Sequence, residues 1–354
     1  MQFRISRTSN LRSTLSTTIT VLALLAGPAA GIAQPVVSHA AVSNSAVVAK
    51  SPFTVSVFAQ SVPGAYTQPD SITHSDTAIY IGYGNGNAPD GSDGKSSTIV
   101  EYGFDGSVRK TILVQGHNDG LKVNPTTHEL WAMQNEDGHA KLVVFNPTTW
   151  ARTVYLIGTG PHGGGYDDMT FIGNKAYISA SAPTHNPNTA PAIAEITLQG
   201  GRAYLKPVLM ANSTAVDIRS GNTVTLNLQD PDSMTLNPGG DIVLDSQSDG
   251  ELVVVSRPGG ADQDVYRVLL TANGKPTTVD DTIFPHTSSG TLLVSDRDGE
   301  TVYAITKPFL QPGSGYSASD SGGFIGELNF DTGVLTPVVT GMVSPHGMNF
   351  IPGQ

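Results

Sequence analysis

The amino-acid sequence predicts an all-β fold, and three observations lead to that prediction. Short runs of alternating or continuous apolar residues, such as TVSVFA, AIYIGYG, KLVVFN and ELVVVS, occur throughout the chain after residue 50. Turn residues separate these runs, because the chain contains 39 Gly and 23 Pro. No window carries the helical i, i+3, i+4, i+7 apolar pattern over three turns. Short strands joined by turns are therefore expected along the whole domain.

The first 33 residues have the composition of a secretory signal peptide. An apolar stretch, TITVLALLAGPAAGIA, follows a positively charged segment that contains Arg4, Arg7 and Arg12. The stretch is too short, and too interrupted by Gly and Pro, to span a membrane. Cleavage is expected after Ala33, with cleavage after Ala40 as the alternative. The mature chain is therefore expected to be secreted or periplasmic.

Three parts of the chain are expected: the signal peptide at 1–33, a flexible lead-in at 34–50 and a single β domain at 51–354. The chain has no cysteine, so core packing must supply its stability without disulfides. It is acidic, with a formal net charge of −11 and no Lys/Arg runs. These properties argue against nucleic acid and anionic membranes as partners. We expect a monomer with a small-molecule or saccharide ligand.

A six-residue pattern recurs along this domain. Its copies are PDSITH (69–74), NDGLKV (118–123), YDDMTF (166–171), PDSMTL (231–236), DDTIFP (280–285) and PHGMNF (345–350). The second residues of the copies, which we call the anchors, are Asp70, Asp119, Asp167, Asp232, Asp281 and His346, spaced 49, 48, 65, 49 and 65 residues apart. An apolar side chain follows each anchor two positions later, as at the start of a strand.

A period near 48 residues that contains about four short strands is typical of a β-propeller blade. The sequence thus predicts a single β-propeller with six blades of four-stranded antiparallel sheet, with five blades as the alternative. The sixth copy has only its inner strand before the sequence ends. FTVSVFAQ (53–60) is therefore expected to close the ring. The two longer intervals contain 212–229 and 307–323, which we expect to be surface excursions.

In a propeller the inner strands line a central channel, so the anchors are expected to form a ring at one mouth. The second strands would end at the same face with Asn85, Asn135, Ser181, Asp245 and Asp296. Carboxylates at close range raise one another's pKa unless a proton, a hydrogen-bond donor or a cation compensates them. Asp and Asn oxygens suit Ca²⁺. Zinc is disfavoured, because there is no Cys and no locally spaced pair of His ligands.

The repeated Asp also has a purely structural interpretation. An Asp before a strand commonly accepts hydrogen bonds from turn N–H groups and so fixes the loop between blades. Departures from the repeat are then more informative about function than its regularities. These departures are Asn118, Tyr166, Asp168, Asp280 and His346.

Imidazole transfers protons near neutral pH, so we expect His346 to be catalytic, together with His117 and the anchor Asp167. The residues expected at the rim, in contact with a ligand, are Tyr166, Asp168, Asn135, His162 and Asp245.

The triplet NDG (118–120) before an inner strand, with PDS (69–71 and 231–233) and PHGM (345–348) at equivalent places, resembles the gluconolactonase/senescence-marker-protein superfamily. That superfamily overlaps with NHL-repeat and streptogramin-lyase-like propellers, and the resemblance covers most of 53–354. In the lactonase family a Glu, two Asn and an Asp hold a divalent metal in the channel mouth. The resemblance implies Asn118 as one ligand. This chain departs from the family pattern by having Asp232 in place of an Asn and by lacking the Glu in QPDS (68–71).

Three classes of function follow from the residues and the resemblance. The first is a metal-dependent hydrolase of lactones or similar esters, in which the metal ligands are expected among Asn118, Asp119, Asp232 and Asp70. The second is a metal- and His-assisted lyase of the streptogramin-lyase or polysaccharide-lyase type. The third is a propeller without catalysis that binds a ligand or protein and uses its aspartates structurally. The fold alone does not choose among them.

Overall fold

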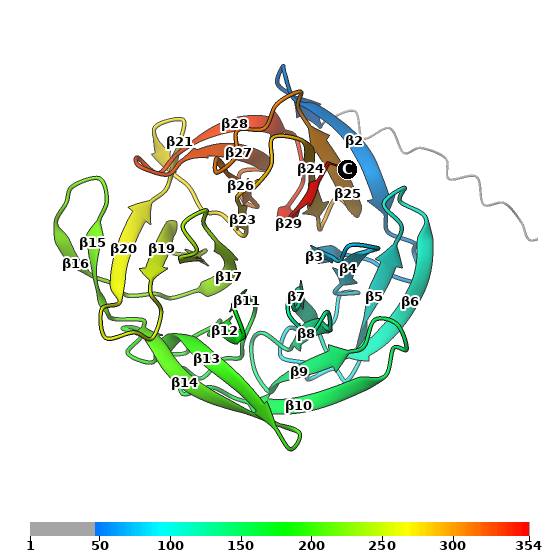
Figure 1. The fold of residues 1–354 in the computed structure, drawn as a ribbon, viewed down its shortest axis with the longest axis horizontal. Coiled ribbons are helices and arrows are strands. Elements are labelled where there is room, and N and C mark those ends of the chain that lie inside the picture. The colour runs from blue at the N-terminus through cyan, green and yellow to red at the C-terminus, as the bar shows by residue number, and fades with distance from the viewer. Residues whose placement is uncertain (1–46, 354) are drawn as a thin grey trace, which may run out of the picture. The chain divides into compact units, whose positions relative to one another are not determined.

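Residues 47–353 of the computed structural model form sheets arranged around a central axis (Figure 1). The predicted signal peptide and most of the predicted lead-in lie outside these described residues. The described part contains strands and turns, and none of it forms an apolar helix of the length needed to cross a membrane. The predicted all-β propeller is confirmed.

The first three blades follow the order of the chain, each from its inner to its outer strand. Blade 1 consists of β3 (Pro69–His74), β4 (Ile79–Tyr83), β5 (Ser96–Tyr102) and β6 (Val108–Gln115). Blade 2 consists of β7 (Asn118–Val123), β8 (Leu130–Gln134), β9 (Ala140–Phe145) and β10 (Arg152–Gly158). Blade 3 consists of β11 (Met169–Ile172), β12 (Lys175–Ser179), β13 (Pro191–Gln199) and β14 (Arg202–Met210). The outer strands β10 and β14 pair with each other in parallel.

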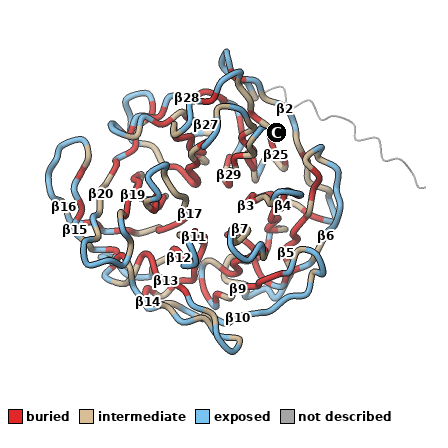
Figure 2. Tube along the Cα trace, in the orientation of Figure 1, coloured by how far each residue is buried: buried red, intermediate tan, exposed pale blue. Residues whose placement is uncertain are grey.

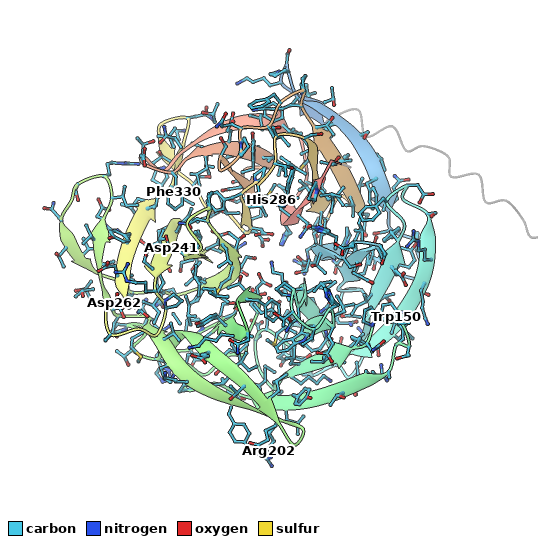
Figure 3. All side chains as sticks on the ribbon, viewed as in Figure 1. Trp150, Arg202, Asp241, Asp262, His286 and Phe330 are labelled. Atoms are coloured by element: carbon cyan, nitrogen blue, oxygen red, sulfur yellow. The ribbon has the colours of Figure 1, made fainter. Side chains whose placement is uncertain are left out.

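Blade 4 also follows chain order, with β17 (Pro231–Leu236), β18 (Ile242–Ser246), β19 (Glu251–Ser256) and β20 (Asp264–Leu269). The hairpin of β15 (Thr214–Asp217) and β16 (Thr223–Thr225) extends its outer edge through β20. This hairpin lies in 212–229, which was predicted to be an excursion. Arg202, at the turn between β13 and β14, and Asp262, before β20, mark the outer side of this half of the ring (Figure 3).

The last two blades are interleaved along the chain. Blade 5 consists of β23 (Thr282–Ile283), β26 (Gly315–Ser319), β27 (Phe324–Asn329) and β28 (Val334–Thr340). Blade 6 consists of β29 (Pro345–Pro352), β24 (Gly290–Asp296), β25 (Thr301–Thr306) and β2 (Thr54–Gln60). After β23 the chain therefore crosses to blade 6 for one hairpin, returns to blade 5 for three strands, and ends on the inner strand of blade 6. The N-terminal strand β2 closes the ring as the outermost strand of blade 6.

Two predictions about the last units are wrong. The run TLLVSD (291–296), expected as the second strand of the fifth unit, pairs instead with β29 in blade 6. The segment 307–323, expected as a surface excursion, contains the fully buried β26, which is the strand that pairs with β23. In addition, β1 (Val48–Ala49) lies at the end of the predicted flexible lead-in and pairs with β28. Two short strands, β21 (Thr271–Ala272) and β22 (Lys275–Pro276), extend the same outer edge.

Six buried apolar clusters hold the ring together, and each fills the space between two neighbouring blades. Between blades 1 and 2, for example, Tyr80 and Ile99 pack against Leu121, Leu130 and Phe145. Figure 2 shows the same division, with buried segments inside the ring and exposed ones along its outer strands. Each fully buried Leu, Ile or Phe contributes roughly 1.5–3 kcal/mol, so contacts between blades dominate the stability. This packing fixes the start of every inner strand at one end of the channel.

Candidate functional site

The register of the fifth blade differs by one residue from the predicted one. Asp168, which follows the anchor of blade 3, accepts a hydrogen bond from the amide of Met234 in blade 4 (3.0 Å). Asp281 does the same for the amide of Met348 in blade 6 (2.7 Å). Asp281 is therefore the counterpart of Asp168 and connects two blades, so the channel-facing anchor of blade 5 is Asp280.

With this correction, each of the six blades contributes one anchor at the same mouth of the channel, where the anchors interact through their charges. They are Asp70, Asp119, Asp167, Asp232, Asp280 and His346. Charges within this group shift the pKa of Asp70, Asp119, Asp167, Asp232 and His346. The loops after β8 and β24 add Glu136 and Arg297 to this group. The ring of carboxylates expected from the sequence thus exists, and a guanidinium and an imidazole interrupt it.

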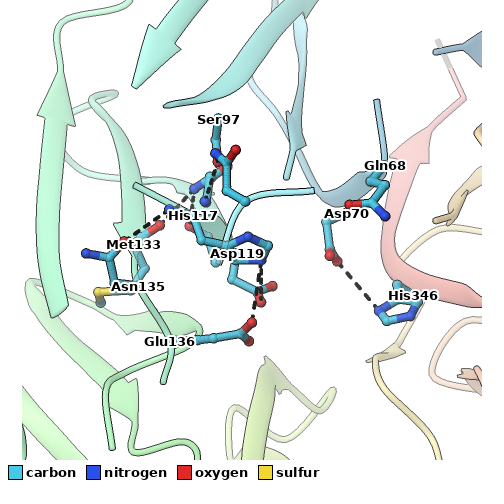
Figure 4. Close-up of polar contacts among 12 residues, drawn as sticks. Gln68, Asp70, Ser97, His117, Asp119, Met133, Asn135, Glu136 and His346 are labelled. Atoms are coloured by element: carbon cyan, nitrogen blue, oxygen red, sulfur yellow. Dashed lines mark hydrogen bonds and ion pairs between the residues drawn. The ribbon is translucent and has the colours of Figure 1, made fainter. Parts of the chain in front are cut away.

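The first cluster of the site consists of His117, Asp119 and Glu136, all from blade 2 (Figure 4). Nε2 of His117 lies 3.5 Å from Oε1 of Glu136 and 3.9 Å from Oδ2 of Asp119. Neither ring nitrogen of His117 has a hydrogen-bond partner among the described residues. Burial lowers the pKa of this imidazole despite the neighbouring Asp119 carboxylate. Burial therefore favours the neutral form of an imidazole that lies in ion-pair range of two acidic groups.

The two carboxyl groups of this cluster share a hydrogen bond. Burial and the neighbouring Asp119 raise the pKa of Glu136 well above its ordinary value. Burial acts to raise the pKa of Asp119, but the hydrogen bond from Glu136 and the charges of His117, Arg297 and His346 together outweigh burial and lower this pKa. The side chains of Asp119 and Glu136 remain 17% and 20% exposed, so the cluster can be reached from solvent.

The second cluster consists of Asp70, Asp280 and His346, from blades 1, 5 and 6. Nδ1 of His346 lies 3.8 Å from Oδ1 of Asp70 (Figure 4). The same nitrogen lies 3.0 Å from Oδ1 of Asp280. Its Nε2 lies 2.9 Å from Oγ of Ser344. Burial lowers the pKa of His346, but Asp280 and Asp70 outweigh burial and raise it to about 10. The imidazolium and Arg297, whose Nε is 3.6 Å from Oδ2 of Asp70, balance the two carboxylates.

A hydrogen bond between carboxyl groups also joins the anchors of blades 3 and 4. Burial, the charge of Asp119 and the hydrogen bond with Asp232 raise the pKa of Asp167 well above its ordinary value. Burial raises the pKa of Asp232 as well, although the hydrogen bond with Asp167 opposes the rise. Two like charges cannot both stay ionised at this range, so the pair retains a proton at pH values where isolated aspartates are ionised.

Lys122 and Asp168 form an ion pair farther along the inner strands, with Nζ 3.1 Å from Oδ2. The charges of Asp281 and Asp167 also raise the pKa of Lys122 and so keep it protonated. The structure thus uses Asp168 to connect blades 2, 3 and 4, which is the structural role considered for the repeated aspartates. The sequence predicted Asp168 at the rim instead.

The other residues expected at the rim are buried and engaged in internal contacts. Asn135 accepts a hydrogen bond from the amide of His117 (3.0 Å). His162 contacts the carbonyl of Gly165 (2.7 Å) and the ring of Tyr166 (5.2 Å between centroids). Asp245 accepts a hydrogen bond from the hydroxyl of Thr282 (3.1 Å). These contacts hold the loops that carry the site.

Asn118, expected as a metal ligand by resemblance, does not lie in either cluster. Its Nδ2 donates to the carbonyl of Met133 (2.8 Å). Its Oδ1 lies so close to Gly82 of blade 1 that a Cβ atom added to Gly82 would be 2.2 Å from it. The side chain therefore occupies the space between blades 1 and 2. Of the other expected ligands, Asp119 belongs to the first cluster, Asp70 to the second and Asp232 to the carboxyl pair.

Four residues of the site were not predicted from the sequence: Glu136, Arg297, Lys122 and Ser344. A signal for two of them was present, because Glu136 and Arg297 directly follow Asn135 and Asp296, which were predicted at this face. Ser344 precedes its anchor by two residues, as His117 does. Which loops meet across the ring depends on tertiary packing, so these contacts could not be predicted from local pattern.

The first cluster fits a divalent ion better than the second. Its imidazole is buried and lies within 4 Å of two acidic groups, and within residues 47–353 no Lys or Arg forms an ion pair with Asp119 or Glu136. In the second cluster both ring nitrogens of His346 already have partners and two cationic groups balance the acids. One nitrogen and two carboxylate oxygens form a donor set that suits Zn²⁺ or Mn²⁺, whereas Ca²⁺ takes oxygen ligands.

No family model matches the chain, and no curated protein matches it. Among solved structures, a protein of unknown function from Bacteroides caccae is 13% identical, with 80% of this chain and 86% of that chain covered and a TM-score of 0.50. A streptogramin B lyase is 11% identical over 85% and 88% of the two chains, with a TM-score of 0.45. A periplasmic gluconolactonase from Pseudomonas aeruginosa is 10% identical over 80% and 88%, also with a TM-score of 0.45.

The solved structures similar to this chain thus include a streptogramin B lyase and a periplasmic gluconolactonase. The similarity to the Bacteroides caccae protein, at 13% identity, concerns the fold alone, so the chemistry has to be argued from the residues of this chain.

Proposed function

We propose that the protein is a metal-dependent hydrolase of lactones or similar esters, with a divalent ion bound by His117, Asp119 and Glu136. The observation that carries this proposal is the buried imidazole of His117, whose Nε2 lies 3.5 Å from Oε1 of Glu136 and 3.9 Å from Oδ2 of Asp119. An imidazole in this position is a ready ligand. We propose Zn²⁺ or Mn²⁺ in place of the Ca²⁺ expected from the sequence, because the set includes a nitrogen.

When bound, such an ion supplies Lewis-acid polarisation of a carbonyl and a more acidic water. The residues of the chain would provide the remaining functions. The hydrogen-bonded pair of Asp167 and Asp232 holds a proton that can be given to a leaving alkoxide. Arg297 places a guanidinium beside the carboxylates of Asp70 and Asp119, where it lowers the repulsion that an electron-rich substrate would meet.

Metal analysis of the purified protein tests this proposal most directly. After dialysis against Zn²⁺, Mn²⁺ or Ca²⁺ in turn, elemental analysis should find about one equivalent of Zn²⁺ or Mn²⁺ and less Ca²⁺. The variant Glu136→Gln should lose that ion and the hydrolysis of lactone substrates. The matched control is Glu129→Gln, because Glu129 lies next to the opposite end of β8 and its exposed carboxylate accepts a hydrogen bond from the nearby hydroxyl of Thr127 (2.8 Å). A protein that binds none of these ions would rule out the metal-dependent hydrolase.

A lyase remains a second candidate, because Asp280 orients the imidazole of His346 at 3.0 Å in the same mouth. A His held by a carboxylate can abstract a proton in an elimination. The product separates the two reactions: hydrolysis adds one water to the substrate, whereas elimination gives products whose masses sum to that of the substrate. If the protein binds a ligand but converts none, the third class, a binding propeller, is supported.

A further inference from the structure

Ser344, His346 and Asp280 form a continuous hydrogen-bonded line that the proposed metal site does not use. Oγ of Ser344 lies 2.9 Å from Nε2 of His346, and Nδ1 of the same ring lies 3.0 Å from Oδ1 of Asp280. The hydroxyl and the carboxylate are therefore on opposite ring nitrogens. This is the geometry in which an imidazole accepts a proton from a nucleophile while a carboxylate orients it.

Hydrogen bonds between the backbone of Ser344 and residues at the end of β24 hold Ser344 in place. The amide of Ser344 donates to Oδ1 of the fully buried Asp296 (2.8 Å), and its carbonyl accepts from the amide of Arg297 (2.9 Å). Ser344 itself is only partly buried, so a substrate can reach it. The nucleophile is therefore oriented by its surroundings and open to solvent, which an acyl-transfer site requires.

Two charged groups complete the arrangement. Oδ1 of Asp70 lies 3.8 Å from Nδ1 of His346 and adds to the stabilisation of an imidazolium. Arg297 is anchored through its amide to the carbonyl of Ser344, and its Nε lies 3.6 Å from Oδ2 of Asp70. Arg297 therefore adds a positive charge near the line of Ser344, His346 and Asp280, paired with the carboxylate of Asp70.

We propose that Ser344, His346 and Asp280 form a second hydrolytic centre, independent of metal, in which small carboxylic esters or lactones acylate Ser344. Oγ of Ser344 attacks the carbonyl carbon and its proton passes to Nε2 of His346. The bond between that carbon and the alkoxy oxygen then breaks, and the leaving oxygen takes the proton. Water attacks the acyl-serine in the same way and returns the proton to Oγ. No oxidant, cofactor or ion is consumed.

The charges around His346 predict how this centre responds to pH. Asp280 and Asp70 favour the protonated ring, and Arg297 opposes them. The neutral base is therefore the minor form at pH 7, and acylation should be faster at pH 9 than at pH 7. This proposal does not depend on an ion at His117, Asp119 and Glu136, so either centre can fail alone.

Covalent labelling in the presence of EDTA tests the proposal. A fluorophosphonate probe incubated with the full chain should add one label per molecule, and peptide mapping should find it on Ser344. Ser344→Ala and His346→Gln should abolish the label, whereas Glu136→Gln should keep it. Ser61 is the matched control, because its hydroxyl contacts the carboxylate of Glu300 and no imidazole. A label elsewhere, or one retained in Ser344→Ala, would overturn the proposal.

A cysteine variant gives a second readout that depends only on the environment of residue 344. The chain has no cysteine, so Ser344→Cys carries a single thiol. An adjacent imidazolium stabilises the thiolate, so iodoacetamide at pH 7 should alkylate this variant roughly tenfold faster than Ser61→Cys. Equal rates in two variants with wild-type melting temperatures would show that His346 does not activate residue 344.

Discussion

Asp168 offers the sharpest test of how the blades are held together. Its Oδ2 accepts hydrogen bonds from the amide of Met234 (3.0 Å) and from Nζ of Lys122 (3.1 Å), so one carboxylate connects three blades. Replacing Asp168 by Ala removes a hydrogen bond to a charged acceptor, which contributes about 1.5–3 kcal/mol. It also leaves the largely buried ammonium of Lys122 without its closest counter-ion. We expect Asp168→Ala to lower the free energy of unfolding by about 3–5 kcal/mol.

Urea unfolding at pH 7, followed by the fluorescence of Trp131 and Trp150, measures this change. Trp131 packs against Phe171 between blades 2 and 3. Asp168→Asn can still accept from the amide of Met234 but cannot neutralise Lys122, so about half of the loss is expected. The control Asp76→Ala, in an exposed turn, should change stability by less than about 0.5 kcal/mol. A loss below about 1 kcal/mol in Asp168→Ala would refute the argument.

Two further predictions concern stability. Burial raises the pKa of Glu251 from 4.5 to about 7, although Arg267 opposes the rise. The protonated carboxyl therefore contributes to the free energy of unfolding below pH 4.5. This contribution, roughly 3 kcal/mol, is lost as the pH rises through 7. Glu251→Gln should lack this fall, and parallel pH profiles of unfolding for variant and wild type would contradict the assignment. At Gly120 a Cβ would lie 2.2 Å from the carbonyl oxygen of Asp167 in the next blade. Gly120→Ala should cost about 1–3 kcal/mol, measured as a lower melting temperature, whereas Gly138→Ala, with its nearest atom at 3.8 Å, should melt like the wild type.

The start of each inner strand could be predicted from the sequence, because a carboxylate followed two residues later by an apolar side chain repeats in almost every blade. The fifth blade was misaligned because the doublet Asp280–Asp281 allows two registers. Only the hydrogen bond from Met348 to Asp281, across two blades, decides between them. The assignment of 290–296 failed for a related reason. Strands of a repeat are expected to pair in chain order. The partner of β24 is instead β29, about fifty residues later.

Some residues of the candidate site could likewise be predicted from the repeat, and others could not. His117, Asp119 and His346 were expected because they belong to the repeat or flank it. Glu136 was missed because it lies in a loop after a second strand. Ser344 becomes part of a hydrogen-bonded line only when the loop before β29 packs beside Asp280 of another blade. The side chains that define the chemistry therefore come together through ring closure, which carries no local sequence pattern.

The interleaving of blades 5 and 6 also sets when the ring can close during synthesis of the chain. The hairpin β24–β25 leaves the ribosome well before its inner partner, so the edge of β24 that faces the channel stays unpaired until residues 345–352 have been made. Ser344 and His346 arrive with that same segment. A nascent chain that stops short of it has neither a closed ring nor the serine–histidine pair, so any hydrolysis by this pair begins only when the sixth blade receives its last strand.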